Sequence, residues 1–495
     1  MNIFKKKSLC VALAGVGALG AAGAAQAVNL NPDGLGSVLV YPYYTVRADA
    51  NGNAYNSLLS VVNTTGSVKA VKVRFLEGKN SQEVLDFNVF LSGKDVWTAA
   101  IVPSGAGGAM VVTEDNSCTI PKLAAAGQPF RNSLYALDGG GSSLDRTNEG
   151  YVEIIEMTQY FDNTTTAFNA THDSTGMPNC AGVTDSQANS DAINFSAGEQ
   201  GGLMGGMTLI NVDAGTDYTE DAVALDNFAF GDNLYTTAGS LLPDMTFADP
   251  PISIVPDQGG TMSSQWAPFG TQTPDPVSAV LIHDHVMNEY VLDAITASGT
   301  DWVVTMPTKR FYVSKGTGRA SKLFQRNFNK TDGSCDDVNL NIYDREEQTF
   351  TQLDFSPPQL TGTAICWEAN VITFNQSNVL GSVNSQNVDT QGFEHGWLDL
   401  SWFPTIAVNP DGLSPPVQPT HTLVNSGVAP LNNTLTFLGG GTSTGPATYV
   451  GLPVVGFAVQ SFTNGAITVN GASVLSNYGG NFVHKGTRTI NFSAL

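Results

Sequence analysis

The chain has 495 residues with 22 basic and 44 acidic side chains, which gives a net charge of −22 at pH 7. A negative charge of this size repels nucleic acid and anionic lipid surfaces, so it excludes a nucleic-acid-binding protein and favours solubility and cation binding. Charged residues make up only 13% of the chain, whereas Gly, Ser, Thr and Asn are abundant. This composition is typical of strands joined by turns, and we predict an all-β protein.

Residues 1–27 have the pattern of a cleavable signal peptide. Three lysines at positions 5–7 precede an apolar stretch over 9–21, and Ala25-Gln26-Ala27 matches the small-x-small cleavage pattern. The apolar stretch is shorter than the roughly 20 residues that a membrane span needs. We predict cleavage before Val28 and no transmembrane segment in the mature chain. Without the leader the chain has 19 basic and 44 acidic residues, a net charge of −25.

Residues 28–114 are predicted to form an N-terminal β-sandwich-like domain. Between Ser37 and Ser104, β-branched and aromatic runs alternate with turn residues. Apolar side chains at 71, 73 and 75 alternate with Lys72 and Arg74, and this period of two indicates a half-buried strand. The spacing is typical of immunoglobulin-like sandwiches, although the Cys…Trp…Cys core of antibody domains is missing.

Two further regions follow. Residues 115–276 are predicted to be a loop-rich β region with short helices, in which 123–137 is an expected helix and Tyr151–Phe161 an expected strand. Strand-like runs return at Val277, and we predict a second sandwich-like domain over 277–495. The prediction is therefore two sandwich-like domains separated by a loop-rich region.

Four cysteines follow the predicted cleavage site: Cys118, Cys180, Cys335 and Cys366. An even number in an exported chain favours disulfides over a metal site or a catalytic thiol. Three pairings are open. We prefer the sequential one, Cys118 with Cys180 and Cys335 with Cys366, because each bond then closes a loop within one region of the chain.

Three stretches carry a resemblance to known sequences: LNPDGLGSVLVYPYYTV, LLSVVNTTGSVKAVKVRFLEGKNSQEVLDFNVFLS and GTDWVVTMPTKRFYV. In these stretches the chain resembles a family of exported proteobacterial proteins that are labelled uncharacterised or cell-surface proteins. The resemblance implies a Gram-negative source and an envelope or extracellular location. It implies no catalytic residues.

His283 and His285 are candidate zinc or copper ligands, with Asp284 between them and Glu289 close by. Alternate residues of a strand project to the same face, so two imidazoles at this spacing can share an ion. The sequence identifies no third or fourth ligand. An exposed His-x-His pair without a metal is the simpler alternative.

Asp213, Asp217, Glu220 and Asp221 are candidate calcium ligands, because hard cations take several oxygen ligands from a flexible loop. Their order does not match an EF-hand. A solvated acidic loop is the more frequent outcome in an acidic protein, so calcium is a hypothesis and no cofactor is assigned.

Tyr41, Tyr43, Tyr44 and Trp97 are candidate ligand-binding residues, because aromatic rings with one polar end stack well on sugars at half-wet positions. Ser443 lies in a G-x-S-x-G pattern, but extended chain follows it where a nucleophile elbow needs a helix. No catalytic residues are assigned.

We interpret the protein as a non-enzymatic, secreted or cell-surface β protein that contributes to the envelope or to extracellular interactions, as a scaffold or adhesin. Its expected partners are other envelope or extracellular components, and the periplasm is the alternative location. Two alternative functions stay open: a carbohydrate- or ligand-binding module, and a secreted hydrolase with a dispersed site.

Overall fold

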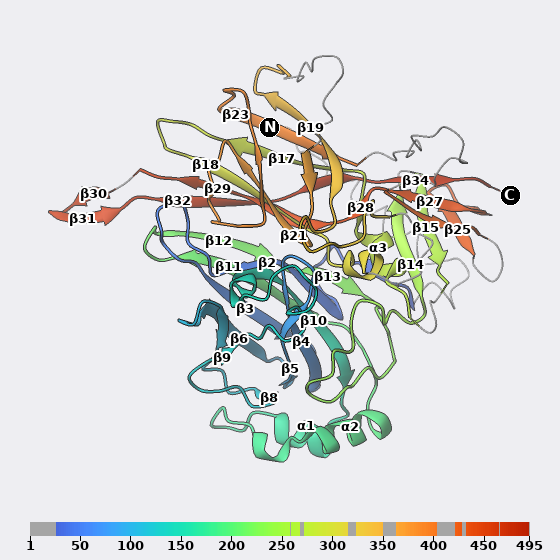
Figure 1. Cartoon of the computed structure of the whole chain (residues 1–495). Helices are drawn as coiled ribbons and strands as arrows, with labels where there is room; N and C mark the ends of the chain where they lie inside the picture. The colour runs from blue at the N-terminus through green and yellow to red at the C-terminus, as the bar shows by residue number, and fades with distance from the viewer. Residues whose placement is uncertain are drawn as a thin grey trace, which may run out of the picture.

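The computed structural model describes residues 26–257, 259–267, 272–314, 323–349, 363–402, 421–427, 432–464 and 466–494. Strands predominate in these residues and the helices are few and short, which confirms an all-β fold (Figure 1). Most of the predicted signal peptide, residues 1–25, lies outside the described residues. No helix in the described part of the chain is long and apolar enough to cross a membrane.

The first half of the chain is a sandwich of two sheets. In sheet order, the seven-stranded sheet contains β1 (Asn29–Leu30), β13 (Val223–Asp226), β2 (Val38–Thr45), β10 (Glu149–Gln159), β4 (Lys69–Glu77), β5 (Glu83–Leu91) and β8 (Cys118–Ile120). The six-stranded sheet contains β12 (Thr216–Asp221), β11 (Leu203–Asn211), β3 (Asn56–Asn63), β6 (Val96–Pro103), β7 (Ala109–Val112) and β9 (Gln128–Pro129).

The alternating residues 71–75 do lie in a strand, β4, but this strand is buried on both faces. Val71, Val73 and Phe75 pack into the core between the two sheets, as the period of two predicts. Lys72 and Arg74 on the opposite face are also buried, so the expectation of a half-buried strand is wrong. These cations can be buried because carboxylates from the neighbouring strands β5 and β10 form ion pairs with them.

The sheets do not end at the boundary that the sequence suggests. Strands β10 to β13 lie in the stretch 115–276, which was expected to be loop-rich, yet they pair with β1 to β4 and complete both sheets of the first sandwich. Strand pairing between residues more than a hundred positions apart leaves no signal in local periodicity, so the boundary at residue 114 has no counterpart in the sheets.

The second half of the chain forms smaller sheets, whose pairings are antiparallel except for β21 with β22 among the described residues. Two of these sheets have five strands. The first contains, in order, β20 (Thr363–Ile365), β19 (Asp336–Asp344), β23 (His395–Ser401), β17 (His285–Val291) and β33 (Lys485–Thr487). The second contains, in order, β22 (Ser385–Val388), β21 (Ala369–Phe374), β18 (Gly299–Thr305), β29 (Val455–Phe462) and β32 (Tyr478–Val483). The other sheets contain β14 (Ile252–Asp257), β15 (Gly260–Gln265), β25 (Asn433–Phe437) and β26 (Thr442–Thr444); β24 (Thr422–Asn425), β27 (Ala447–Val450) and β34 (Thr489–Phe492); β16 (Ile282–His283) with β28 (Leu452–Pro453); and β30 (Ala466–Val469) with β31 (Ala472–Leu475).

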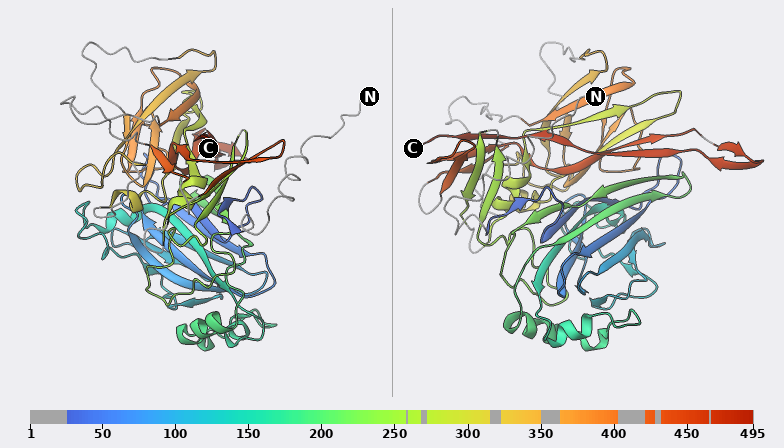
Figure 2. Two further views of the ribbon diagram at one scale, coloured as in Figure 1. Left: turned by 90° about the vertical axis from the view of Figure 1, so that its right-hand side faces the viewer. Right: turned by 180° about the vertical axis from the view of Figure 1, so that it is seen from behind.

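The views in Figure 2 show how these parts are arranged. The first sandwich, in blue to green, forms one side of the molecule, and the yellow to red strands of the second half lie across its other side. The hairpin of β30 and β31 projects beyond the body at the end of the long pair β29 and β32.

The helices are α1 (Thr165–Ala170), α2 (Asp185–Asn194), α3 (Asp275–Leu281) and α4 (Arg310–Val313), with 3-10 turns η3 (Leu144–Asn148) and η4 (Cys180–Gly182). Thr164 and Thr184 begin α1 and α2 as N-caps, because each hydroxyl accepts a hydrogen bond from a backbone N–H of the first turn. The expected helix at 123–137 does not form, since this stretch consists of turns and β9. The expected strand at Val277 begins instead as α3.

Both disulfides of the sequential pairing are present, which confirms that prediction. Cys118 and Cys180 tie β8 to η4 with an S–S distance of 2.04 Å. Cys335 and Cys366 join the start of β19 to the end of β20.

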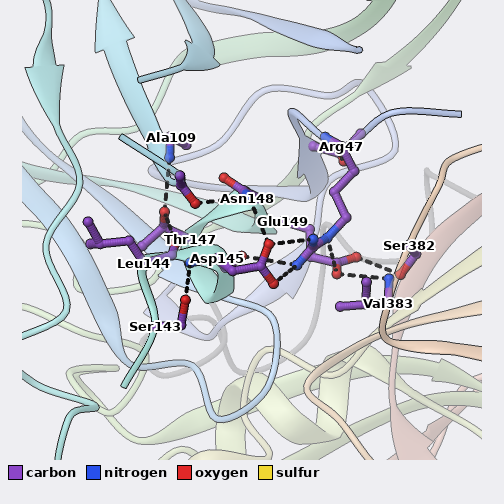
Figure 3. A network of polar contacts seen from close by, with 12 residues as sticks. Arg47, Ala109, Ser143, Leu144, Asp145, Thr147, Asn148, Glu149, Ser382 and Val383 are labelled. Carbon is purple, nitrogen blue, oxygen red and sulfur yellow. Dashed lines mark hydrogen bonds and ion pairs between the residues drawn. The ribbon is translucent and has the colours of Figure 1, made fainter. Parts of the chain in front are cut away.

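The two halves share their apolar cores and a buried polar junction. The core cluster that contains Leu39 and Phe75 also contains Val303 and Phe457 of the second half. Figure 3 shows the polar junction around Glu149, whose carboxylate accepts hydrogen bonds from Arg47 Nε at 2.7 Å, from Ser382 Oγ and from the Val383 backbone N–H. The same carboxylate accepts a hydrogen bond from Tyr43 Oη at 2.8 Å. A buried carboxylate with partners from both halves holds them in one arrangement.

Candidate functional site

The four aromatic residues that were expected to form a ligand platform are all buried. Tyr41, Tyr43, Tyr44 and Trp97 have at most 1% of their surface exposed. The Tyr41 hydroxyl donates to the Ser60 carbonyl at 2.8 Å, and Trp97 packs edge-on against a core phenylalanine. These rings pack in the core of the first sandwich, so the prediction of an aromatic ligand platform is wrong.

His283 and His285 belong to separate strands, β16 and β17, because the chain bends at Asp284. His283 Nδ1 bonds the Leu281 carbonyl at 2.9 Å, and His285 Nδ1 lies 2.8 Å from Asp399 Oδ1. Within the described ranges, no three His, Cys, Asp or Glu side chains lie close enough together to hold one metal ion.

The acidic residues expected to bind calcium are divided between two faces of β12. Asp217 and Asp221 are exposed, whereas Glu220 is buried on the opposite face, and Asp213 lies in the preceding turn. Because alternate residues of a strand point in opposite directions, this cluster in the sequence is not a cluster in space.

Ser443 lies in the middle of β26, an edge strand in which it pairs with Leu435. A nucleophile elbow needs a sharp turn from a strand into a helix. Residues 447–450, which follow Ser443, form the strand β27.

A groove of about 900 Å³ lies on the outer face of the six-stranded sheet. We call it the sheet groove. Five adjacent strands line it, in the order β12, β11, β3, β6 and β7, together with Asp33 and Gly34 from the turn after β1.

Strand register explains why this face is hollow. The central row across the sheet contains Asp221, Gly206, Ser60 and Thr98, which are paired with one another across β12, β11, β3 and β6. Only small side chains occupy the middle of this row, so the row forms a trough. Glu114, just beyond β7, lines the opposite end from Asp221.

Two ridges of larger side chains flank the trough. Leu58 lies two residues before Ser60 on β3, and Val62 two residues after it, paired with Met204 of β11. Leu58 is 41% exposed and Met204 is 43% exposed. Residues two apart on a strand are about 7 Å apart, so the ridges are separated by about 13 Å, which is room for one extended chain.

The floor of the groove is held from below by the core. A side chain at Gly205 would place its Cβ 2.3 Å from Tyr41 Oη and 2.2 Å from the Ser60 carbonyl oxygen, so only glycine fits there. This contact allows the Tyr41 hydroxyl to reach Ser60 beneath the trough. The groove is therefore formed by a packed sheet rather than by loops.

The lining has one sign of charge. Asp33, Glu114 and Asp221 are its charged residues, and no Lys or Arg of the described chain lines it. The remaining polar groups are hydroxyls of Ser60 and of threonines such as Thr98. The groove therefore favours neutral or cationic ligands with apolar side groups.

Sequence reasoning missed Leu58, Met204 and Gly206 because they lie on strands about 150 residues apart and have no catalytic or ligating chemistry. The one local signal was the run Leu203-Met204-Gly205-Gly206-Met207, since glycine within a strand marks a close approach of another group. Comparison of the chain with protein-family models, with curated proteins and with solved structures found no match.

Proposed function

We propose that this protein is a non-enzymatic exported binding protein, of the adhesin or scaffold type, whose sheet groove holds an extended segment of a partner protein. The observation that carries the proposal is the apolar trough with a carboxylate at each end and, among the described residues, no basic side chain in its lining. The two disulfides fit an exported chain, because such bonds persist in oxidising compartments.

The geometry supports a particular kind of segment. Asp221 on β12 and Glu114 after β7 are separated by four strand spacings of about 4.8 Å, or about 19 Å along the trough. An extended chain rises about 3.3 Å per residue, so two basic residues six positions apart match these carboxylates. Apolar side chains between them pack against Leu58 and Met204.

A protein segment fits the groove better than a sugar chain does. The part of the lining that the structure describes contains hydroxyls but no aromatic ring, and flat sugar faces stack best on aromatic rings. A second copy of the same chain fits less well, because the mature protein is strongly acidic and the groove adds further carboxylates of the same sign.

The test uses two heptapeptides on the full mature chain, measured by biolayer interferometry at low salt. The first peptide has the sequence Lys-Ser-Leu-Ser-Leu-Ser-Lys, and the second has Glu in place of both Lys. We expect the lysine peptide to bind at least tenfold more tightly than the glutamate peptide, and Leu58→Glu to weaken its binding at least tenfold. Val424→Glu, an exposed strand position elsewhere, is the matched control.

A charge-reversal variant makes the test stricter. The double variant Asp221→Lys with Glu114→Lys should reverse the preference and bind the glutamate peptide more tightly. Asp162→Lys with Asp337→Lys, two exposed acids outside the groove, changes the net charge equally and should leave the preference unchanged. Equal binding of both peptides by the wild-type chain, or binding of neutral hexasaccharides in their place, would contradict the proposal.

A further inference from the structure

A second, smaller pocket of about 210 Å³ lies where the first sandwich meets the C-terminal strands. Leu30 of β1 and Val223 of β13 form one wall, and Leu281 of α3 and Val286 of β17 form another. The chain from Val483 to Arg488 closes the outer side. The pocket is therefore mostly apolar and lies apart from the sheet groove.

Arg488 has an unusual environment for a cation. Its Nε donates to the Ile282 carbonyl at 3.1 Å and its Nη2 to the Val280 carbonyl at 2.9 Å, at the end of α3. No carboxylate of the described residues forms an ion pair with it, and burial lowers the pKa of the guanidinium below its usual range. Because arginine stays protonated in proteins, the pocket holds a partly desolvated positive charge that forms no ion pair with a described carboxylate.

The two histidines of the pocket do not add to this charge. Burial lowers the pKa of His283 and of His484 to about 4, so both rings are neutral at pH 7. Each ring donates to a backbone carbonyl at 2.9 Å: His283 Nδ1 to Leu281 and His484 Nε2 to Val303. The rings thus act as polar walls of fixed orientation.

Glu220 closes the pocket from the side of β12. It accepts a hydrogen bond from Asn481, and burial raises the pKa of its carboxyl to about 7. The carboxyl is therefore partly protonated at neutral pH and does not neutralise Arg488 as a full anion would. Lys485, also in the lining, is exposed, and its charge lowers the pKa of the Glu220 carboxyl, so it does not act as a second desolvated cation.

The chemistry of the lining favours binding. Within the described residues it contains no hydroxyl or thiol side chain that could act as a nucleophile. Apolar walls around a single desolvated cation instead form a binding site for an amphipathic anion.

We propose that this pocket binds a small carboxylate with an apolar tail, whose carboxylate pairs with Arg488 and whose tail packs among the valines. The pairing supplies the anion that the protein itself does not, and charge-assisted hydrogen bonds between a guanidinium and a carboxylate are strong. The outer wall packs closely against the pocket, because a Cβ at Gly486 would approach Cδ2 of the His283 ring to 2.5 Å.

The experiment is calorimetric titration of the full mature chain at pH 7 with hexanoate, 1-hexanol and hexylammonium. We expect one hexanoate per chain, bound at least tenfold more tightly than either of the other two. Arg488→Gln should lower hexanoate affinity at least tenfold and leave that for hexanol unchanged. Arg345→Gln, at an exposed arginine, is the matched control.

A second variant keeps the test decisive if Arg488→Gln does not fold. Val454→Phe fills the apolar end of the pocket without removing a charge and should abolish binding of hexanoate and hexanol alike. Hexanoate that binds no more tightly than hexanol to the wild-type chain, or equally well to the Val454→Phe variant, overturns the proposal. Neither result bears on the sheet groove, whose probes are peptides.

Discussion

Replacing the buried carboxyl of Glu368 with an amide should make the protein more stable above neutral pH. Glu368 is 1% exposed, just before β21. One of its oxygens accepts hydrogen bonds from Ser81 Oγ at 2.9 Å and from the Arg310 backbone N–H at 3.2 Å. Burial raises the pKa of this carboxyl to about 8. The folded protein therefore keeps the proton that the unfolded chain has already lost.

The size and the sign of the effect follow from proton linkage. Between the ordinary pKa of glutamate, about 4.3, and the folded value, stability falls by about 1.4 kcal/mol for each pH unit, because the unfolded state binds fewer protons. From pH 5.5 to pH 7.5 the free energy of unfolding of the wild-type chain falls by about 3 kcal/mol because of this one group. Glu368→Gln keeps an oxygen that can accept both hydrogen bonds, but its amide does not titrate in this pH range.

The assay is urea unfolding of the wild-type chain and of Glu368→Gln at pH 5.5, 6.5 and 7.5. The amide resembles the protonated carboxyl, so we expect the variant to be more stable by about 1.6 kcal/mol at pH 5.5 and by about 4 kcal/mol at pH 7.5. Glu114→Gln, at an exposed acid, should follow the wild type within about 0.5 kcal/mol. Burial also raises the pKa of Glu153 to about 7, so a smaller slope remains in the variant. Parallel pH profiles for the wild type and Glu368→Gln would refute the assignment of a neutral buried carboxyl.

Three further predictions concern the ion pairs, the disulfides and the leader. Arg74→Met should destabilise the chain by about 3–5 kcal/mol in chemical unfolding, because two buried glutamates lose their cation. A loss under 1 kcal/mol would show that the two glutamates do not need Arg74 in order to be buried. The double variant Cys118→Ser with Cys180→Ser should lose about 2–5 kcal/mol, and peptide maps of the oxidised wild type should contain this pair. Mass spectrometry of exported protein should find Val28 at the N-terminus, and a retained residue 1 would contradict cleavage.

Local patterns in the sequence were enough to predict several elements. The alternation at 71–75 predicted β4, and the β-branched and aromatic run at Tyr151–Phe161 predicted β10, which extends over Glu149–Gln159. Both strands could be predicted because the order of apolar and polar residues over a few positions is enough to indicate a strand. The sequential disulfide pairing was also predicted, because short loops close within one region of the chain.

Which face each strand buries was decided only by the tertiary structure. Lys72 and Arg74 are polar on a strand that alternates, yet β5 and β10 bring Asp86, Glu83 and Glu153 against them and bury both. Tyr41 is a residue type that suits a half-exposed ligand platform, but its strand β2 lies inside the seven-stranded sheet, and the second sheet covers that face.

The two candidate sites depend on the same long-range pairing. The sheet groove exists because β11 places Gly206 beside Ser60 of β3. The small pocket exists because the chain between β33 and β34, which carries Arg488, lies against the first sandwich. A sequence by itself determines the period of a strand and the chemistry of each side chain. The partner that covers each face comes from segments far along the chain, and that partner decides whether a charge is solvated, paired or left for a ligand.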